Sequence, residues 1–121
     1  MVLSLVIIHV SNRSAIEASY GREAFRRVSR DIEAAVQTVL GRPPRQSASA
    51  GEDFVAVLPG AYLDQARAAA MRIRRRLPRE VSEHGLITPV ELVIEIETVD
   101  HGARTVETIS ARPPLRRQRA A

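Results

Sequence analysis

Two adjacent carboxylates, Glu52 and Asp53, follow Gly51 between a weak strand candidate and a strongly apolar one. The pattern around them predicts a β-hairpin whose turn spans residues 50–53. Paired acids at a hairpin tip are either a solvated turn or the carboxylates of a metal site, because hard divalent cations prefer oxygen ligands. The choice between these two interpretations decides most of the functional argument.

Other polar side chains that could do chemistry stand at the ends of predicted elements. His9 and Ser11 close the first apolar run, and Arg42 and Arg45 precede the hairpin, where they could pair with phosphates. We interpret His9 as a hydrogen-bonded histidine at the rim of the core. The other two histidines are too scattered along the chain to complete a metal site with it.

The elements that must position these residues follow from hydrophobic periodicity. Residues 2–10 are apolar almost throughout, which is typical of a strand buried on both faces. The full prediction is a strand at 2–10, one long helix from cap candidates Ser11, Asn12 and Ser14 to Val39, strands at 45–50 and 54–58, a helix from Tyr62 that ends at Pro78, a strand at 90–99 and a further strand at 104–109.

The order β-α-β-β-α-β predicts an α+β fold of the ferredoxin-like type, with two helices on one face of an antiparallel sheet and an extra C-terminal strand. Right-handed crossovers then make the first strand and the second hairpin strand neighbours at the centre of the sheet. We therefore expect the end of the first strand, at residues 9–11, to lie beside the hairpin tip at residues 51–53.

Composition indicates one domain, at residues 1–110, followed by a basic tail at residues 111–121 that we expect to be disordered. The chain contains 18 Arg and Lys against 14 Asp and Glu, and the net charge of +4 comes from the four arginines of the tail. There is no cysteine, which excludes a disulfide scaffold and a thiol nucleophile. The first apolar run is too short to cross a bilayer and has no basic residues before it, so we expect a cytoplasmic protein with no membrane contact.

Four stretches resemble the GGDEF family, the diguanylate cyclases. "AGEDFVAVLPG" is similar to the signature hairpin, "SLVIIHVSNRSAIEASYG" to the first strand and its helix, "YLDQARAAAMRIRRRL" to the helix after the hairpin, and "VELVIEIE" to the last core strand. The resemblance covers about residues 3–97. It implies the palm-like fold and a site in which two metal ions activate a ribose hydroxyl against a GTP phosphate.

Carried over residue by residue, the resemblance implies a degenerate site. The metal carboxylate of the first strand falls at His9, and the next acid of that strand falls at Ser11. In the signature, Ala50 replaces the first glycine, while Gly51, Glu52 and Asp53 remain. We expect no catalytic residues and no cofactor, with magnesium bound only if the vestigial nucleotide site survives.

Further positions depart from the family pattern. Glu17 falls where the family has a guanine-reading Asn, and the inhibitory-site motif becomes "RPPR", from Arg42 to Arg45, without its Asp. The family's final helix has no counterpart. Because the core pattern is intact while these positions are replaced, the leading hypothesis is a non-catalytic module that binds a protein partner or forms a homodimer.

Two other hypotheses stay open. The first is a sensor that binds GTP or cyclic di-GMP without turnover, through Glu52, Asp53, Arg42 and Arg45. The second is nonspecific nucleic-acid binding through the arginine tail. The lack of aromatic residues for base stacking on the sheet disfavours a sequence-reading mode but leaves nonspecific phosphate binding possible. The run from Arg72 to Arg76 predicts the exposed side of a helix, which could also contact phosphate or an acidic partner.

Overall fold

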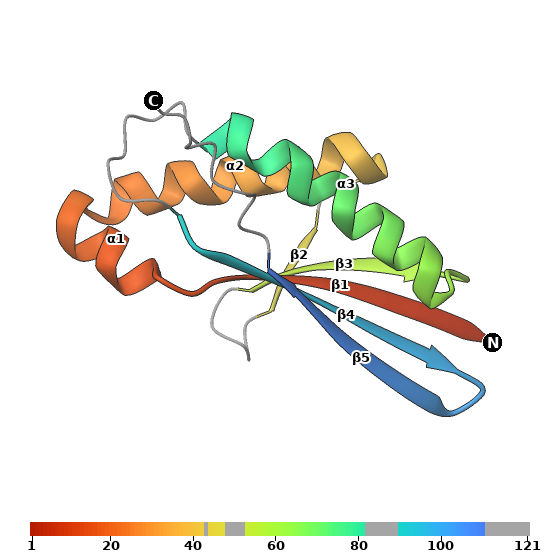
Figure 1. Cartoon of the computed structure of the whole chain (residues 1–121). Helices are drawn as coiled ribbons and strands as arrows, with labels where there is room; N and C mark the ends of the chain where they lie inside the picture. Colours follow the sequence, from red (N-terminus) through yellow and green to blue (C-terminus); the bar gives the residue numbers. More distant parts are fainter. Residues whose placement is uncertain (43, 48–52, 82–89, 111–121) are drawn as a thin grey trace, which may run out of the picture.

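The computed structural model describes residues 1–42, 44–47, 53–81 and 90–110. Its elements are β1 (Val2–Val10), α1 (Arg13–Tyr20), α2 (Arg22–Leu40), β2 (Arg45–Ser47), β3 (Asp53–Pro59), α3 (Leu63–Val81), β4 (Leu92–Asp100) and β5 (Ala103–Ser110). The strands form one antiparallel sheet in the order β2-β3-β1-β4-β5 (Figure 1). The predicted ferredoxin-like α+β fold and its extra C-terminal strand are confirmed.

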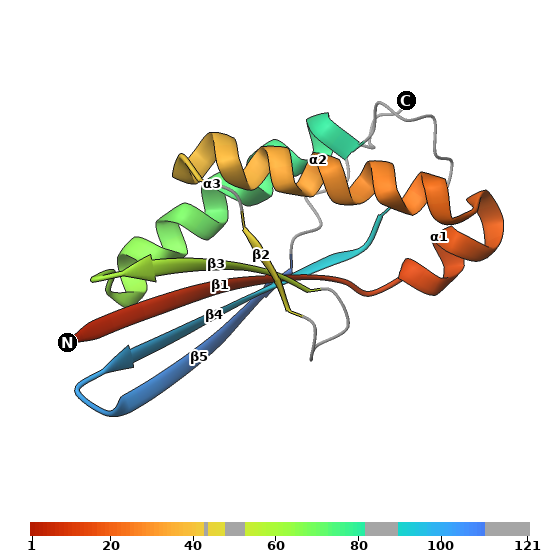
Figure 2. The same cartoon turned by 180° about the vertical axis from the view of Figure 1, so that it is seen from behind.

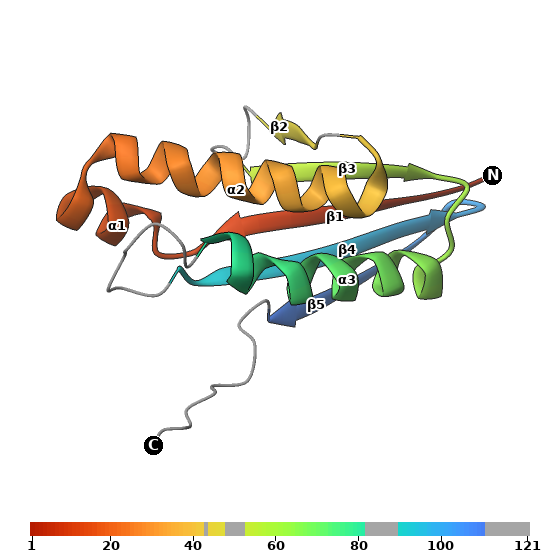
Figure 3. The same ribbon diagram turned by 90° about the horizontal axis from the view of Figure 1, so that it is seen from above.

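Helices α2 and α3 pack against each other and lie side by side on one face of the sheet, as Figure 3 shows from above. The core between them and the sheet is aliphatic apart from Phe25 and Phe54. It includes Ile32 of α2 and Ile73 of α3, both fully buried. One apolar stripe on each helix therefore meets one apolar face of the sheet, which is the two-layer arrangement expected for this chain length.

Strand β1 is buried on one face only, so the prediction of burial on both faces is wrong. Val6 and Ile8 are fully buried beneath the helices, whereas Leu3, Leu5 and Ile7 on the opposite face are half-buried. Figure 2 shows the described helices on a single side of the sheet. The strand is apolar on both sides, but among the described elements only one layer of helices covers it.

The long N-terminal helix of the prediction is two helices, α1 and α2, divided at Gly21. This glycine has φ 93° and ψ 169°, a conformation that is essentially restricted to glycine because it has no Cβ. Asn12 precedes α1, but its side chain does not cap the helix. Its Oδ1 instead accepts a hydrogen bond of 2.9 Å from the backbone N–H of Glu91.

Helix α3 also differs from the prediction, because it continues through Pro78 to Val81. A proline removes one helical N–H donor and crowds the preceding turn. Near the end of this helix those effects do not stop it, and three further residues keep the helical conformation.

Polar contacts support both the centre and the β5 edge of the sheet. The buried Ser4 hydroxyl of β1 donates to the carbonyl of Ala61 at 2.7 Å and shares a 2.7 Å hydrogen bond with Thr98 of β4. On the edge strand β5, Glu107 accepts two hydrogen bonds from Arg67 of α3, at 2.9 and 2.6 Å. This contact lowers the pKa of Glu107 and raises the pKa of Arg67, through the hydrogen bond first and the charge attraction second.

Candidate functional site

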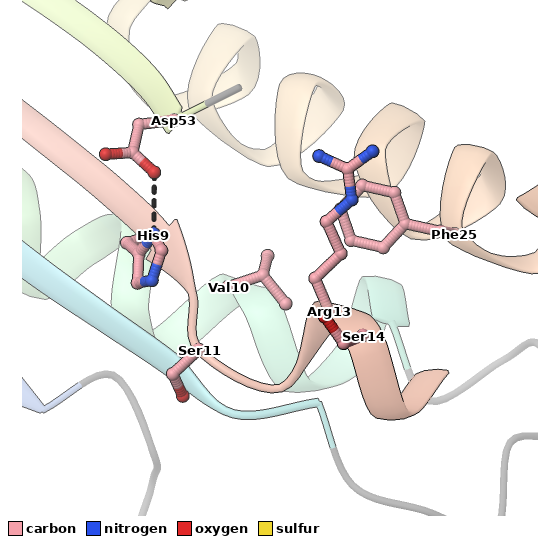
Figure 4. A pocket seen from close by; sticks show the side chains of 7 residues that line it. All are labelled: His9, Val10, Ser11, Arg13, Ser14, Phe25 and Asp53. Atoms are coloured by element: carbon pink, nitrogen blue, oxygen red, sulfur yellow. Dashed lines mark hydrogen bonds and ion pairs between the residues drawn. The ribbon is translucent and has the colours of Figure 1, made fainter. Parts of the chain in front are cut away.

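The end of β1 and the start of β3 bring His9 and Asp53 together. The His9 Nδ1 atom lies 2.7 Å from the Asp53 Oδ1 atom (Figure 4). Ile8 is the register partner of Phe54, so His9 and Asp53 are the next cross-strand neighbours on the opposite face of the sheet. The predicted proximity of the first strand to the hairpin tip is thus confirmed for this pair.

Asp53 does not lie in the turn predicted at residues 50–53, so that bound of the turn is wrong. It is the first residue of β3, and only 16% of its side chain is exposed, against 53% for His9. The register of β1 and β3 ends at Ile8 and Phe54, and His9 and Asp53 occupy the next positions, where the imidazole holds the carboxylate. His9 is the hydrogen-bonded rim histidine that the sequence predicts.

A pocket of about 220 Å³ opens beside this pair, lined by His9, Asp53, Val10, Ser11, Arg13, Ser14 and Phe25. The Arg13 guanidinium lies 4.5 Å from the centre of the Phe25 ring, as Figure 4 shows. Its Nε also donates to Glu17 at 3.3 Å. The sequence analysis missed Arg13 as a site residue, although its place directly after the first strand could have indicated it.

Ser11 is bound to Glu91, the residue before β4, rather than to the pair. Its backbone N–H donates to the carbonyl of Glu91 at 2.8 Å, and its hydroxyl donates to the same carbonyl at 3.2 Å. Figure 4 shows the Ser11 side chain directed away from Asp53. Ser11 therefore lines the pocket but does not take the place of a second carboxylate.

The described donors do not fit a magnesium ion. Magnesium requires oxygen ligands in near-octahedral geometry, whereas this corner offers one imidazole and one carboxylate that are already bonded to each other. Over the described ranges, no group of three or more His, Cys, Asp or Glu side chains could hold a metal ion. Gly51 and Glu52 of the predicted site lie outside the described residues.

The predicted phosphate-binding arginines lie after α2 and in β2. Arg42 is exposed after α2 and, among the described side chains, does not line the pocket. Arg45 lies in β2 with Val55 as its register partner. Residues 48–52 and 111–121 lie outside the described residues, so the predictions made for them stay predictions.

Two further basic clusters lie on the helices. Arg72, Arg75 and Arg76 line a groove of about 390 Å³ with Thr38 and Val39, and Arg72 and Arg75 are exposed as predicted.

The second cluster lies at the other end of α2. Arg13, Glu17, Arg22 and Arg26 line a pocket of about 400 Å³. Glu17, at the position of the family's guanine-reading residue, is here the ion-pair partner of Arg13.

No protein-family model matches the chain, and no curated protein sequence matches it significantly. Among solved structures, the chain is similar to the active GGEEF domain of a diguanylate cyclase from Vibrio cholerae, with a TM-score of 0.68 and 23% sequence identity. The chain has a GGDEF-like fold. The similarity covers 85% of this chain and 65% of the cyclase chain, so about a third of that chain has no counterpart in the match.

The resemblance places the family's site at the corner where the end of β1 lies beside the start of β3. The side chains at that corner are His9 and Asp53, paired with each other. None of the helices in the described ranges is long and apolar enough to span a membrane.

Proposed function

We propose that this GGDEF-like domain is not a cyclase and acts as a protein-interaction or self-association module in cytoplasmic signalling. The observation that carries the proposal is the 2.7 Å contact between His9 and Asp53. It stands where the resemblance expects carboxylates that share a metal ion.

The chemistry of that contact supports the absence of turnover. Two-metal phosphoryl transfer needs carboxylate oxygens that are free to bind cations on both sides of the reacting phosphate. His9 presents a nitrogen where a hard oxygen ligand is required, and it occupies Oδ1 of Asp53. Ser11, the second replaced position, donates its hydroxyl to the carbonyl of Glu91.

The intact scaffold supports a role for the surface. The core is continuous from the sheet to α2 and α3, with Ile8, Ile32 and Ile73 fully buried. A domain that keeps its packing while its site chemistry is replaced still offers a stable surface. Function then resides in that surface rather than in the replaced site.

A second candidate is a sensor that binds a nucleotide without turning it over. The specific observation in its favour is the pocket beside His9, which is lined by Arg13 and Ser14, while the Ser11 hydroxyl is bound to Glu91. An arginine with neighbouring hydroxyl donors can bind phosphate oxygens without a metal ion.

Calorimetric titration of the full chain with GTP and with cyclic di-GMP, each with magnesium, separates the two candidates. No binding of either ligand supports the interaction module. Micromolar binding that Arg13→Ala abolishes and Arg30→Ala preserves supports the sensor, because Arg30 is an exposed arginine of α2 outside the pocket.

Light scattering and pull-down from the native cells test the interaction itself. A chain that stays monomeric at all concentrations and binds no protein would contradict the leading proposal.

A further inference from the structure

Strand β5 lies at one edge of the sheet, and its outer side has no neighbouring strand among the described residues (Figure 1). It pairs with β4 over all eight of its residues without a bulge. Natural proteins protect an edge strand by making it short, by placing charges or proline on it, or by a bulge that ends pairing. β5 contains no proline or lysine, and its β-branched residues are Thr105, Val106, Thr108 and Ile109.

The two charges of β5 are already paired within the chain. Arg104 forms an ion pair with Glu97 of β4, and Glu107 accepts two hydrogen bonds from Arg67 of α3. A neutralised charge repels an approaching strand less than a free one. The opposite edge strand, β2, has only three residues and directly follows Pro44. Of the two edges, β5 is therefore the one that can pair over a long stretch.

The hairpin between β4 and β5 determines which backbone groups of β5 point outward. Its two loop residues, His101 and Gly102, have φ values of 52° and 85°, and Asp100 and Ala103 are the closing register pair. In such a turn the carbonyl of the first residue accepts from the N–H of the fourth, so the backbone groups of Ala103 point toward β4. Hydrogen-bonded and non-hydrogen-bonded residues alternate along an antiparallel strand. The residues whose N–H and C=O groups point outward are therefore Arg104, Val106 and Thr108.

These outward groups are symmetric about Val106, so β5 can pair with β5 of a second copy. In an antiparallel pair centred on this residue, Val106 lies opposite Val106 of the second copy, and Arg104 lies opposite Thr108. All of these are hydrogen-bonded pairs, each of which exchanges two backbone hydrogen bonds. The register thus satisfies every outward N–H and C=O group of the three residues.

The side chains between those pairs are complementary in the same register. Thr105 lies opposite Glu107 of the second copy, where its hydroxyl can donate to the carboxylate, and Ala103 lies opposite Ile109. The other register of equal length is centred on Glu107. It would place two carboxylates opposite each other at a non-hydrogen-bonded pair, where side chains are closest, and like charges directly opposite destabilise a sheet. Self-pairing of β5 therefore favours the register centred on Val106.

Helix α3 leaves room for this pairing. It packs over β4 and β1, which puts its axis about two strand spacings, or ~10 Å, from the symmetry axis at the outer edge of β5. Antiparallel pairing keeps the helices of both copies on the same face of the joined sheet. The two α3 axes would then lie about 20 Å apart, which exceeds the distance of about 8–10 Å between packed helices.

We propose that β5 pairs with β5 of a second copy of this chain, so that two sheets join into one continuous sheet with Val106 on the two-fold axis. The inference rests on the proposed self-association role and assigns its surface. An isologous contact of this kind closes at the dimer and leaves neither β5 edge exposed. An extended segment of another protein could add to the same edge, but only self-pairing brings Val106 against its own counterpart.

Charge substitutions at Val106 test that property, because this side chain is 49% exposed in the single chain. Association of the full chain is measured by sedimentation equilibrium over a concentration series, with circular dichroism as the check on folding. The wild type is expected to dimerise reversibly. Val106→Lys and Val106→Glu are each expected to weaken the dimer at least tenfold, because like charges then lie directly opposite. An equimolar mixture of the two variants is expected to restore dimers, since lysine then lies opposite glutamate.

Single cysteines give a second measurement that does not depend on these charges. The chain contains no cysteine, so Val106→Cys introduces one thiol per copy. In the proposed dimer its two Cα atoms lie about 5.5 Å apart, a separation that a disulfide spans. Thr108→Cys is the matched control on the same face of the same strand, with Cα atoms roughly 14 Å apart. Mild oxidation is expected to cross-link Val106→Cys and to leave Thr108→Cys uncross-linked.

Several results would overturn the proposal. The first is a wild-type chain that stays monomeric at millimolar concentration, and the second is equal cross-linking of the two cysteine variants. A dimer that survives Val106→Lys unchanged would assign association to another surface. Val106→Lys and Val106→Glu chains that remain monomeric when mixed would contradict the pairing of this residue with itself. A protein that binds a monomeric wild type but not Val106→Lys would assign the edge to a strand of a different partner.

The failure of this inference is distinguishable from the failure of the proposed function. A monomeric wild type that binds a protein partner as tightly as Val106→Lys does would leave the interaction role standing and contradict β5 as its surface. A monomeric chain that binds no protein would contradict both.

Discussion

Replacing His9 with Asp is expected to lower stability and to create a response to magnesium. In the wild type, the imidazole Nδ1 lies 2.7 Å from the Asp53 carboxylate. His9→Asp removes this hydrogen bond and places two carboxylates at the corner, where they repel each other until a cation binds both. The matched control, His9→Asn, removes the histidine without adding a charge.

The magnitude follows from the geometry and the exposure of the pair. A hydrogen bond of this kind contributes about 1 kcal/mol, less here because His9 is 53% exposed. Two carboxylates about 4 Å apart repel by about 1 kcal/mol in water-like surroundings. His9→Asp is therefore expected to lower the free energy of unfolding by about 1–2 kcal/mol, which lowers the Tm by roughly 4–8 °C for a domain of this size. Magnesium at ten times its Kd would restore about 1.4 kcal/mol.

The assay is thermal unfolding by circular dichroism, with magnesium chloride or with sodium chloride at equal ionic strength. His9→Asp is expected to gain stability from magnesium specifically, while the wild type and His9→Asn respond equally to both salts. Equal magnesium stabilisation of the wild type and His9→Asp would refute the reasoning that His9 makes this corner unsuitable for a hard cation.

Three further changes test the fold. Ser4→Ala leaves the buried Thr98 hydroxyl without its partner. It is expected to lower the free energy of unfolding, measured with urea, by about 1–3 kcal/mol. The double variant Ser4→Ala/Thr98→Val is expected to recover part of this loss, because it also removes the unpaired hydroxyl. The pKa of Glu107 is lowered by Arg67, so this pair contributes stability above about pH 4 that disappears as the pH falls through the folded-state pKa. The wild type should therefore have a higher Tm than Glu107→Gln near neutral pH and the same Tm in acid. A difference in Tm that persists in acid would contradict the assigned role of the Arg67–Glu107 pair. Gly21→Ala is expected to lower the free energy of unfolding by about 1–3 kcal/mol, because alanine is strained at the positive φ of this residue. An unchanged urea midpoint would contradict this reasoning.

The fold could be predicted from the sequence because each element carries its own period. The two-residue alternation of β4 and the three- and four-residue repeat of α2 and α3 appear directly in the residue types. The break at Gly21 was not predicted for the long helix, because apolar residues continue on both sides of it. The burial of β1 on both faces was predicted wrongly, since the apolar pattern of β1 does not show what covers each side, although the predicted fold already placed both helices on one face of the sheet.

The candidate site was predictable in its location and less so in its details. Strand order brings the end of β1 beside β3, which follows from the crossover rules. Whether Asp53 is solvated or paired depends on register, and register is not visible in the residue types alone. The contact of Arg13 with Phe25 depends on how α1 and α2 pack across Gly21, which local patterns do not specify.

The most direct test of the central claim is a turnover assay with radiolabelled GTP. The folded full chain is incubated with GTP and magnesium, and the products are separated by chromatography, with an active diguanylate cyclase as the positive control. The account predicts no cyclic di-GMP above the level of a blank without protein. Formation of cyclic di-GMP that disappears in Asp53→Asn would contradict it, because the chain would then be an active cyclase.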